Sequence, residues 1–423
     1  MNQTSPPPAP TPFTPYQKLV IPLLALLQFT VVLDFMVLAP LGDMLMKSLA
    51  IGPRQFGVVV SSYAFSAGAS GIMAAGFADK FDRKKLLLFF YAGFVVGTLA
   101  CALSTSYELL LAARIITGLF GGVIGAISMA IIADLFTLQQ RGRVMGTVQM
   151  GFAASQVLGI PIGLYLANHW GWHSTFLMIV GLSVLIGIAI VAKIRPITEH
   201  LALQSDKSPF LHLWHTMAKG SYQTGFVATA FLSIGGFMLM PFGSAYLINN
   251  IHISAEQLPM VFLFTGLASI ITMPLIGKLS DRVDKFMLFV AGSALAVLMT
   301  LIYTNLGPSP LWEVLVINII MFAGIMSRMI PSTALTTSLP DLQDRGAFMS
   351  INASLQQMAG GLAAVAAGMI VTQKSPGSPL EHYNVLGLVV SAVIIICCFL
   401  MYRVSVLVKK KLAPAVPAQA VAA

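Results

Sequence analysis

Twelve long apolar stretches, separated by short polar loops, make up most of this chain. We predict membrane-spanning helices at 18–42, 56–76, 86–104, 108–134, 144–167, 175–194, 222–249, 259–277, 286–304, 312–338, 347–372 and 384–407. Most are about 20 residues or longer, the length that a bilayer core requires. Only 9% of the residues are charged, against about 25% in soluble domains. The sequence therefore predicts an all-α polytopic membrane protein with 12 transmembrane helices and excludes a soluble fold.

Two charged loops of similar sequence indicate that the chain is duplicated. They lie at 76–85 and 277–286, and Asp79 and Asp281 occupy matching positions 202 residues apart. Parallel duplicated halves are typical of secondary transporters. We therefore predict two pseudo-symmetric six-helix bundles. The predicted parts are a disordered cytoplasmic N-terminus at 1–16, an N-terminal six-helix bundle at 17–194, a cytoplasmic linker at 195–220, a C-terminal six-helix bundle at 221–407 and a cytoplasmic tail at 408–423.

The placement of Lys and Arg predicts how the chain is oriented. Nineteen of these residues fall on the side that carries both ends of the chain, three fall on the other side, and Arg114 and Arg328 lie within spans. Because positive loops stay in the cytoplasm, both termini are expected there, in a multi-pass protein of the cell (inner) membrane. The net charge of +9 then reflects topology and contacts with membrane lipids, and not a nucleic-acid partner. We expect a monomer.

Both charged loops match one pattern. The matching residues are Asp79, Lys80, Arg83 and Lys84 in the first loop and Gly277, Leu279, Asp281, Arg282 and Lys285 in the second. The pattern resembles the loop signature Gly-x-Leu-Ala-Asp-Arg-x-Gly-Arg-Arg of the major facilitator superfamily, with Asp82 and Asp284 at its second glycine. The fourth span adds Arg114 and Gly118, which match the family's Arg-x-x-x-Gly. The resemblance covers nearly the whole chain and implies the twelve-span fold of that family.

The fifth span contains the segment Gly159-Ile-Pro161-Ile-Gly163. It resembles a variant of the glycine-proline element in the drug:proton antiporter and sugar-efflux branch of the family. Small residues allow close helix approach, and proline interrupts the backbone ladder. The resemblance favours a conformational hinge that limits leak, and plain small-residue packing is the alternative.

The charged loops suggest a conformational latch. Asp79 and Asp281 each lie where a span ends and could cap the N-terminus of a helix from the opposite half. The family's charge relay implies a pair between Arg83 and Asp134, whereas Ser338 stands at the position of Asp134 in the second half. The alternative is that the loop charges only set topology. That alternative explains the bases but not an acid at the same place in both loops.

Asp34 is the only carboxylate far inside an apolar run. A charge there costs about 2.5–3.5 kcal/mol on insertion scales, so it is a functional candidate. If the first span ends near Gly42, Asp34 lies about 12 Å below the outer face, and Arg114, six residues after Glu108, lies about 9 Å below it. The two could therefore meet. Burial favours the neutral acid and the arginine favours the carboxylate, which predicts a proton switch. A static ion pair that fixes helix packing is the alternative.

The C-terminal half offers candidates for a substrate cavity. Arg328 lies about 24 Å from the outer end of the tenth span, shortly before Pro331. It could hold an anionic group of the substrate, act as a gate charge, or snorkel to the inner interface. The seventh span adds adaptable apolar side chains, which lipid-facing packing would explain equally well. These are Phe237, Met238, Phe242 and Tyr246.

We therefore expect a secondary active transporter that exports a small organic molecule or drug by alternating access and proton-coupled antiport, as in multidrug resistance. The proton gradient is the expected energy source, with no metal or other cofactor and no nucleotide-binding loop. Import or facilitated diffusion of a metabolite or a lipid-like substrate stays open as the alternative. A membrane-embedded enzyme is disfavoured, because the spans contain one buried acid, two buried arginines and no cluster of metal ligands. A receptor or scaffold would not need these interior charges.

Overall fold

The computed structural model describes residues 12–74, 77–199, 201, 209–341 and 343–412. Within them, twelve helical segments are long and apolar enough to cross a membrane. The spans of the N-terminal half are α1 (Pro15–Val37), α3 (Pro53–Ala74), α4 (Arg83–Leu103), α5 (Tyr107–Leu135), α6 (Leu138–Ala154) continued by η2 (Ser155–Gly159) and α7 (Ile160–Trp170), and α8 (His173–Lys193). The prediction of an all-α protein with twelve spans is confirmed.

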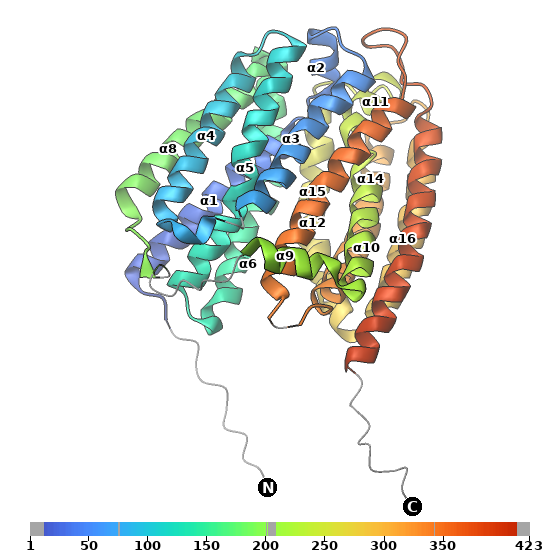
Figure 1. Ribbon diagram of the computed structural model, residues 1–423. Helices are drawn as coiled ribbons and strands as arrows, with labels where there is room; N and C mark the ends of the chain where they lie inside the picture. Colours follow the sequence, from blue (N-terminus) through green and yellow to red (C-terminus); the bar gives the residue numbers. More distant parts are fainter. Residues whose placement is uncertain (1–11, 75–76, 200, 202–208, 342, 413–423) are drawn as a thin grey trace, which may run out of the picture.

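The C-terminal half repeats this order (Figure 1). Its spans are α10 (Gly220–Phe237) continued by η4 (Met240–Phe242) and α11 (Gly243–Asn249), α12 (Leu258–Arg282), α13 (Lys285–Thr304), α14 (Leu311–Thr337), α15 (Arg345–Ile370) and α16 (Tyr383–Leu412). In the described residues, the short helices outside the spans include α2 (Gly42–Ser48), η1 (Ala78–Lys80) and α9 (Pro209–Ala218). The last of these crosses the end of the bundle within the predicted linker (Figure 1).

Local sequence explains where the helices begin. Thr14 forms a capping box with Gln17 at the start of α1, because each side chain binds the other residue's backbone N–H. Asp82 and Asp284 cap α4 and α13, and their carboxylates accept hydrogen bonds from backbone N–H groups of the first turn. The two residues that replace the second signature glycine therefore start the third helix of each half.

Three spans differ from the simple prediction. The first ends at Val37 and not near Gly42, and a turn leads from it into α2. The fifth contains a π-helical turn, η2, because Pro161 has no N–H to donate to the carbonyl four residues earlier. The seventh breaks after Phe237, where Pro241 stands in η4. These breaks place irregular backbone inside the bundle.

The hydrophobic core shows at which end the two halves close. We call the end where α1 begins and α16 ends the terminal face, and the other end the opposite face (Figure 1). Toward the opposite face, one cluster joins both halves and includes Leu41, Phe56, Phe242 and Tyr383. Toward the terminal face, the described residues form one cluster within the N-terminal half and two within the C-terminal half. Among the described residues, the apolar cluster shared by both halves therefore lies toward the opposite face.

A long seam between α3 and α15 holds the halves together along the side of the bundle. Gly57 makes this approach possible, because a Cβ atom there would lie 2.6 Å from the carbonyl oxygen of Ala364. Small residues allow helices to come this close in a membrane.

Candidate functional site

Asp34 and Arg114 meet in the interior of the N-terminal half. The guanidinium Nη1 of Arg114 donates to Asp34 Oδ2 at 2.8 Å and to the Asp34 backbone carbonyl at 3.3 Å. Both side chains are buried, with relative exposures of 0% and 1%. The sequence predicted this meeting, although α1 ends only three residues after Asp34 and the predicted depths assumed a longer span.

The surroundings of the pair are partly polar. Thr98 of α4 donates to Asp34 Oδ1 at 3.2 Å, and the Arg114 guanidinium lies over the Tyr63 ring, 4.5 Å from its centroid. The Nε atom of Arg114 has no hydrogen-bond partner. Removing one member of such a buried pair typically costs about 3–5 kcal/mol, because the other charge is left uncompensated. The arrangement therefore depends strongly on the charge of each partner.

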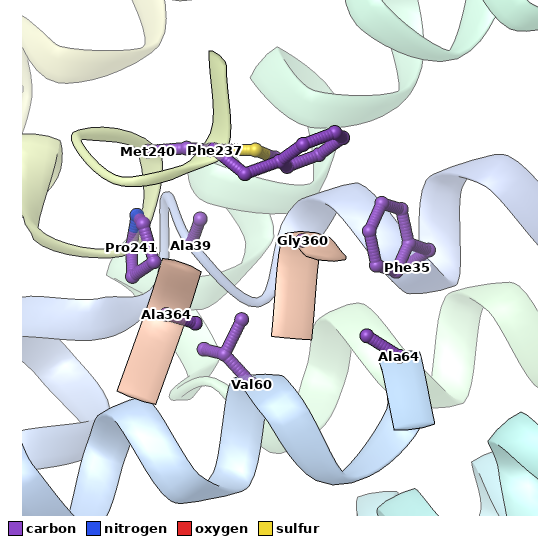
Figure 2. A pocket seen from close by; sticks show the side chains of 9 residues that line it. All are labelled: Phe35, Ala39, Val60, Ala64, Phe237, Met240, Pro241, Gly360 and Ala364. Carbon is purple, nitrogen blue, oxygen red and sulfur yellow. The ribbon is translucent and has the colours of Figure 1, made fainter. Parts of the chain in front are cut away.

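An apolar pocket lies between the two halves, next to this pair. It is a small space between α1, α3, the broken seventh span and α15, and the 350 Å³ or so between its surrounding atoms includes open solvent (Figure 2). Its lining residues are Phe35, Ala39, Val60, Ala64, Phe237, Met240, Pro241, Gly360 and Ala364. The lining contains no charged side chain, so the pocket suits an apolar group.

Phe35 connects the pocket to the ion pair. It follows Asp34 in α1 and points into the pocket (Figure 2). Its ring lies 5.2 Å from the Tyr63 ring and 6.1 Å from the Phe237 ring, measured between centroids. Because Tyr63 also contacts Arg114, two aromatic rings separate the pocket from the buried charges.

The four predicted cavity residues of the seventh span separate in the structure. Phe237 lines the pocket, whereas Met238, Phe242 and Tyr246 are packed in the shared core. The ring of Phe242 contacts Phe56 across the halves, and Tyr246 donates to a backbone carbonyl. In this conformation the last three belong to the closure at the opposite face and not to the pocket wall.

Arg328, the fifth predicted cavity residue, is also away from the pocket. It is 2% exposed and lies inside the C-terminal half. Its Nε donates to Ser293 Oγ at 3.0 Å, and its guanidinium lies 5.6 Å from the centroid of Phe289. The side chain does not snorkel to the terminal face, because it packs against Ser293 and Phe289 of α13 and lies beside Gly235 of α10.

The N-terminal charged loop forms the pair that the family resemblance implied. Arg83 Nε donates to Asp134 Oδ2 at 3.1 Å and Arg83 Nη1 to the Ala78 carbonyl at 3.1 Å. Lys84 Nζ donates to the Val191 carbonyl at 2.9 Å. Lys80 is exposed in η1. The side chain of Asp79 lies outside the described residues, so its capping role stays a prediction.

In the described part of the chain, the polar contacts of the C-terminal charged loop lie within its own half. Asp281 and Arg282 are exposed at the end of α12, and Gly277 has open space beside it. Lys285 donates to the Ser280 carbonyl of its own half at 3.2 Å. A latch between the halves at the terminal face is therefore not engaged by these residues in this conformation.

A polar contact at the opposite face was missed by the sequence analysis. Asn249 Nδ2 donates to Asp43 Oδ1 at 2.5 Å, and Lys47 Nζ donates to Asp43 Oδ2 at 2.7 Å and to Asn249 Oδ1 at 3.3 Å. Ser244 also donates to the Ala39 carbonyl at 2.8 Å. The bonds that involve Asn249 and Ser244 join the halves, and we call Asp43, Lys47 and Asn249 the polar clamp. Asp43 and Lys47 are an acid–base pair four residues apart, the only signal that the sequence offered.

The predicted hinge packs tightly against α1. A Cβ atom at Gly159 would lie 2.7 Å from a methyl group of Leu33, one residue before Asp34. Pro161 and Gly163 are buried in the first turns of α7. The π-helical turn therefore lies directly beside the segment of α1 that carries the ion pair. The hinge role itself stays a prediction.

Comparisons with known proteins agree with this architecture. A family model described as Major Facilitator Superfamily matches residues 24–364 and 225–422. The uncharacterized MFS-type transporter YbcL of Bacillus subtilis is 27% identical over 88% of this chain and 93% of its own length. The bicyclomycin resistance protein homolog of Haemophilus influenzae is 28% identical over 56% of this chain and 59% of its own length. A bacterial homolog of the human lysosomal transporter Spinster, in an inward-facing and unoccupied conformation, aligns with a TM-score of 0.77 at 16% identity, covering 96% of this chain and 100% of that one.

Proposed function

This multi-pass membrane protein belongs to the major facilitator superfamily, and from that premise we propose that it exports a small organic molecule by proton-coupled antiport. The observation that carries the proposal is the buried pair of Asp34 and Arg114. Intramembrane ionisable residues usually serve ion or substrate pathways. A proton gradient would supply the energy.

The pair can act as a proton switch because its stability depends on the charge of Asp34. Protonation at Oδ2 would leave the Asp34 backbone carbonyl as the acceptor of Arg114 Nη1 and leave a buried arginine without a counter-ion. The present packing would then be several kcal/mol less favourable than one that rehydrates or re-pairs the arginine. Proton binding would thus favour a different arrangement of α1 and α5, which is the requirement for coupling.

The pocket provides the route by which cargo would reach this switch. A molecule that fills the pocket contacts Phe35 and Phe237, one from each half. Displacement of Phe35 would move the residue next to Asp34 and the ring that packs on Tyr63. Cargo and proton would therefore compete through one short segment of α1, as antiport requires. Residues of the seventh span that now pack in the closure would join the cavity once the opposite face opens.

We further propose that the terminal face lies in the cytoplasm of the cell (inner) membrane. The excess of Lys and Arg on that side supports this orientation. The conformation closed at the opposite face would then be inward-facing, ready to take cargo from the cytoplasm. Transport out of the cell is supported by a relative that resembles part of this chain, the bicyclomycin resistance protein homolog, since resistance to a compound is consistent with its export.

The test is proton flux in proteoliposomes that contain the purified protein and a pH-sensitive dye, with an imposed pH gradient. Bicyclomycin and a panel of neutral and zwitterionic compounds of similar size serve as probes. Wild-type protein is expected to move protons when one of these is added, and Asp34→Asn should abolish the response while remaining folded and inserted. Glu108→Gln, an exposed acid at the start of α5, is the matched control and should keep the response. Gradient-driven flux that persists in Asp34→Asn would remove Asp34 from the mechanism.

A further inference from the structure

The two oxygens of the Asp34 carboxylate have different partners. Oδ2 accepts from Arg114 Nη1 at 2.8 Å, and Oδ1 accepts from the Thr98 hydroxyl of α4 at 3.2 Å. A guanidinium can only donate hydrogen bonds, whereas a hydroxyl both donates and accepts. A proton on Oδ2 would therefore point at a group that is itself a donor. A proton on Oδ1 would point at a group that can accept it.

The Thr98 hydroxyl has two acceptors for one hydrogen. Its Oγ1 lies 3.2 Å from Asp34 Oδ1 and 2.9 Å from the backbone carbonyl oxygen of Phe94, four residues earlier in α4. Threonine in a helix can bond the carbonyl four residues back, so Phe94 can take this hydrogen whenever Asp34 does not. Turning the hydrogen from Oδ1 to Phe94 frees a lone pair of Thr98 Oγ1 on the side of Asp34.

Burial limits the groups that can serve the carboxylate. Asp34 and Thr98 both have relative exposures of 0%. The other titratable groups that interact with Asp34 are Arg114 of α5, Tyr63 of α3 and Cys101 of α4. In the described part of the chain, the side-chain hydrogen bonds to the carboxylate come from Arg114 and Thr98. Since a buried O–H without an acceptor is costly, Thr98 is the group suited to accept from neutral Asp34.

We propose that Thr98 is a positioning residue that holds the coupling proton on Oδ1 of Asp34. The inference rests on the proposed proton-coupled function and adds the atom at which the proton binds. When Asp34 gains a proton, Oδ1 donates to Thr98 Oγ1, and the Thr98 hydroxyl turns its own hydrogen to the Phe94 carbonyl. Protonation at Oδ1 removes the counter-ion of Arg114, as protonation at Oδ2 does, but without setting two donors against each other.

Infrared difference spectroscopy of the purified protein in lipid tests this directly, with the pH titrated across the range in which the protein stays folded. A protonated carboxyl group has a C=O band that a carboxylate lacks, and the band of Asp34 is the one lost in Asp34→Asn. In Thr98→Val the O–H of the neutral acid has no acceptor, so this band should move to higher wavenumber. Thr98→Ser retains the hydroxyl and should keep the band at its wild-type position. A band that stays in place in Thr98→Val, or the absence of any band that depends on Asp34, overturns the proposal.

Tyr91→Phe is the matched control. The Tyr91 hydroxyl lies 3.0 Å from Thr30 Oγ1, between the same two helices and one turn of α1 away from Asp34. The variant removes a buried hydroxyl from this interface and should leave the Asp34 band in place. An equal shift in Tyr91→Phe and Thr98→Val would assign the effect to general packing between α1 and α4 and would reject the role of Thr98.

A second substitution covers the case in which Thr98→Val does not fold. Thr98→Cys offers a weaker acceptor than a hydroxyl, so it should move the band of Asp34 in the same direction but less far. An unshifted band in Thr98→Cys contradicts the proposal even without data on Thr98→Val.

Proton flux gives a second readout, which separates this proposal from antiport itself. Thr98→Val should lower the flux about tenfold, the change expected for one lost hydrogen bond, and Thr98→Ser should restore it. Absence of flux in wild-type protein, together with an Asp34 band that moves in Thr98→Val, would reject antiport and keep the proton site. Flux that depends on Asp34, with a band that Thr98→Val leaves in place, would keep antiport and reject the role of Thr98.

Discussion

In the N-terminal half, the arginine of the fourth helix pairs with a carboxylate at 2.8 Å, whereas in the C-terminal half the corresponding helix buries Arg328 against Ser293 and an aromatic ring. Both halves tolerate a charge inside the bundle, but only one supplies its counter-ion from within the described chain. The first arrangement contains an acid, whose charge protonation would remove. The second does not, since a guanidinium stays charged at all accessible pH values. Duplication of a fold therefore need not duplicate its chemistry.

The largest expected effect separates the two arginines. Arg114→Gln should destabilise the protein by about 3–5 kcal/mol, because it strands the buried Asp34 carboxylate. Arg328→Gln should cost much less or even stabilise, because it removes a charge that has no partner. The measurement is the unfolding free energy of each purified variant in one detergent.

The double variant Asp34→Asn with Arg114→Gln is the control for this prediction. It should recover much of the loss, since neither partner is then left charged and alone. Equal destabilisation by Arg114→Gln and Arg328→Gln would show that pairing with a carboxylate does not change how much a buried arginine contributes to the unfolding free energy.

A smaller effect is expected at the polar clamp, where the two halves meet. Asn249→Ala removes the bonds to Asp43 and Lys47 and leaves Asp43 with fewer donors. The loss should amount to about 1–3 kcal/mol, which raises the population opened at the opposite face by roughly 5- to 150-fold. A cysteine placed at the pocket residue Val60 should then react faster with a membrane-impermeant maleimide added from that face.

Glu381→Gln is the matched control for the clamp. It breaks the exposed pair with Lys374, 2.9 Å apart, on the same half as Asn249, and should leave the labelling rate unchanged because exposed pairs contribute little. An unchanged rate in Asn249→Ala would show that the shared apolar core alone keeps this face closed.

The smallest effect is expected at Asp284, the N-cap of α13. This carboxylate also forms an ion pair with Lys409, at 2.8 Å. A hydrogen bond from Lys409 lowers the pKa of Asp284 from its usual range. Because the folded pKa is the lower one, this contribution is present above the unfolded pKa of about 3.9. It disappears as the pH falls through the folded value.

Asp284→Asn should therefore destabilise by less than about 1 kcal/mol near pH 7, since Asn is itself a good N-cap and the pair is largely exposed. The difference from wild type should shrink as the pH falls below about 3.9. Unfolding midpoints measured between pH 3 and pH 7 check the trend, and a difference that grows toward acid would reverse the assigned sign.

The span pattern could be predicted because it is local. A run of apolar residues crosses a bilayer whatever its neighbours are, so the twelve helices follow from composition along the chain. Breaks inside spans were harder to predict. Pro161 and Pro241 were visible, but their effect depends on whether nearby helices satisfy the freed carbonyls.

The buried charges were predictable as residues and only partly as contacts. Asp34 and Arg114 could be matched by depth, and they do meet. Depth says nothing about direction around a helix, which turns about 100° with each residue. Hence Phe237 lines the pocket while Met238, the next residue, is packed in the core. The polar clamp joins Asp43 to Asn249, and no local pattern announces a pair so far apart in the chain.

The sequence by itself determined the membrane fold, its duplication and the presence of three interior charges. Only the tertiary structure decided that one arginine is paired, that the other is left with Ser293, and that the halves close at the face away from the termini. The physical reason is that a membrane span requires only a long enough run of apolar residues in one stretch of sequence. The pairing of a buried charge depends on which side chains of distant helices face it.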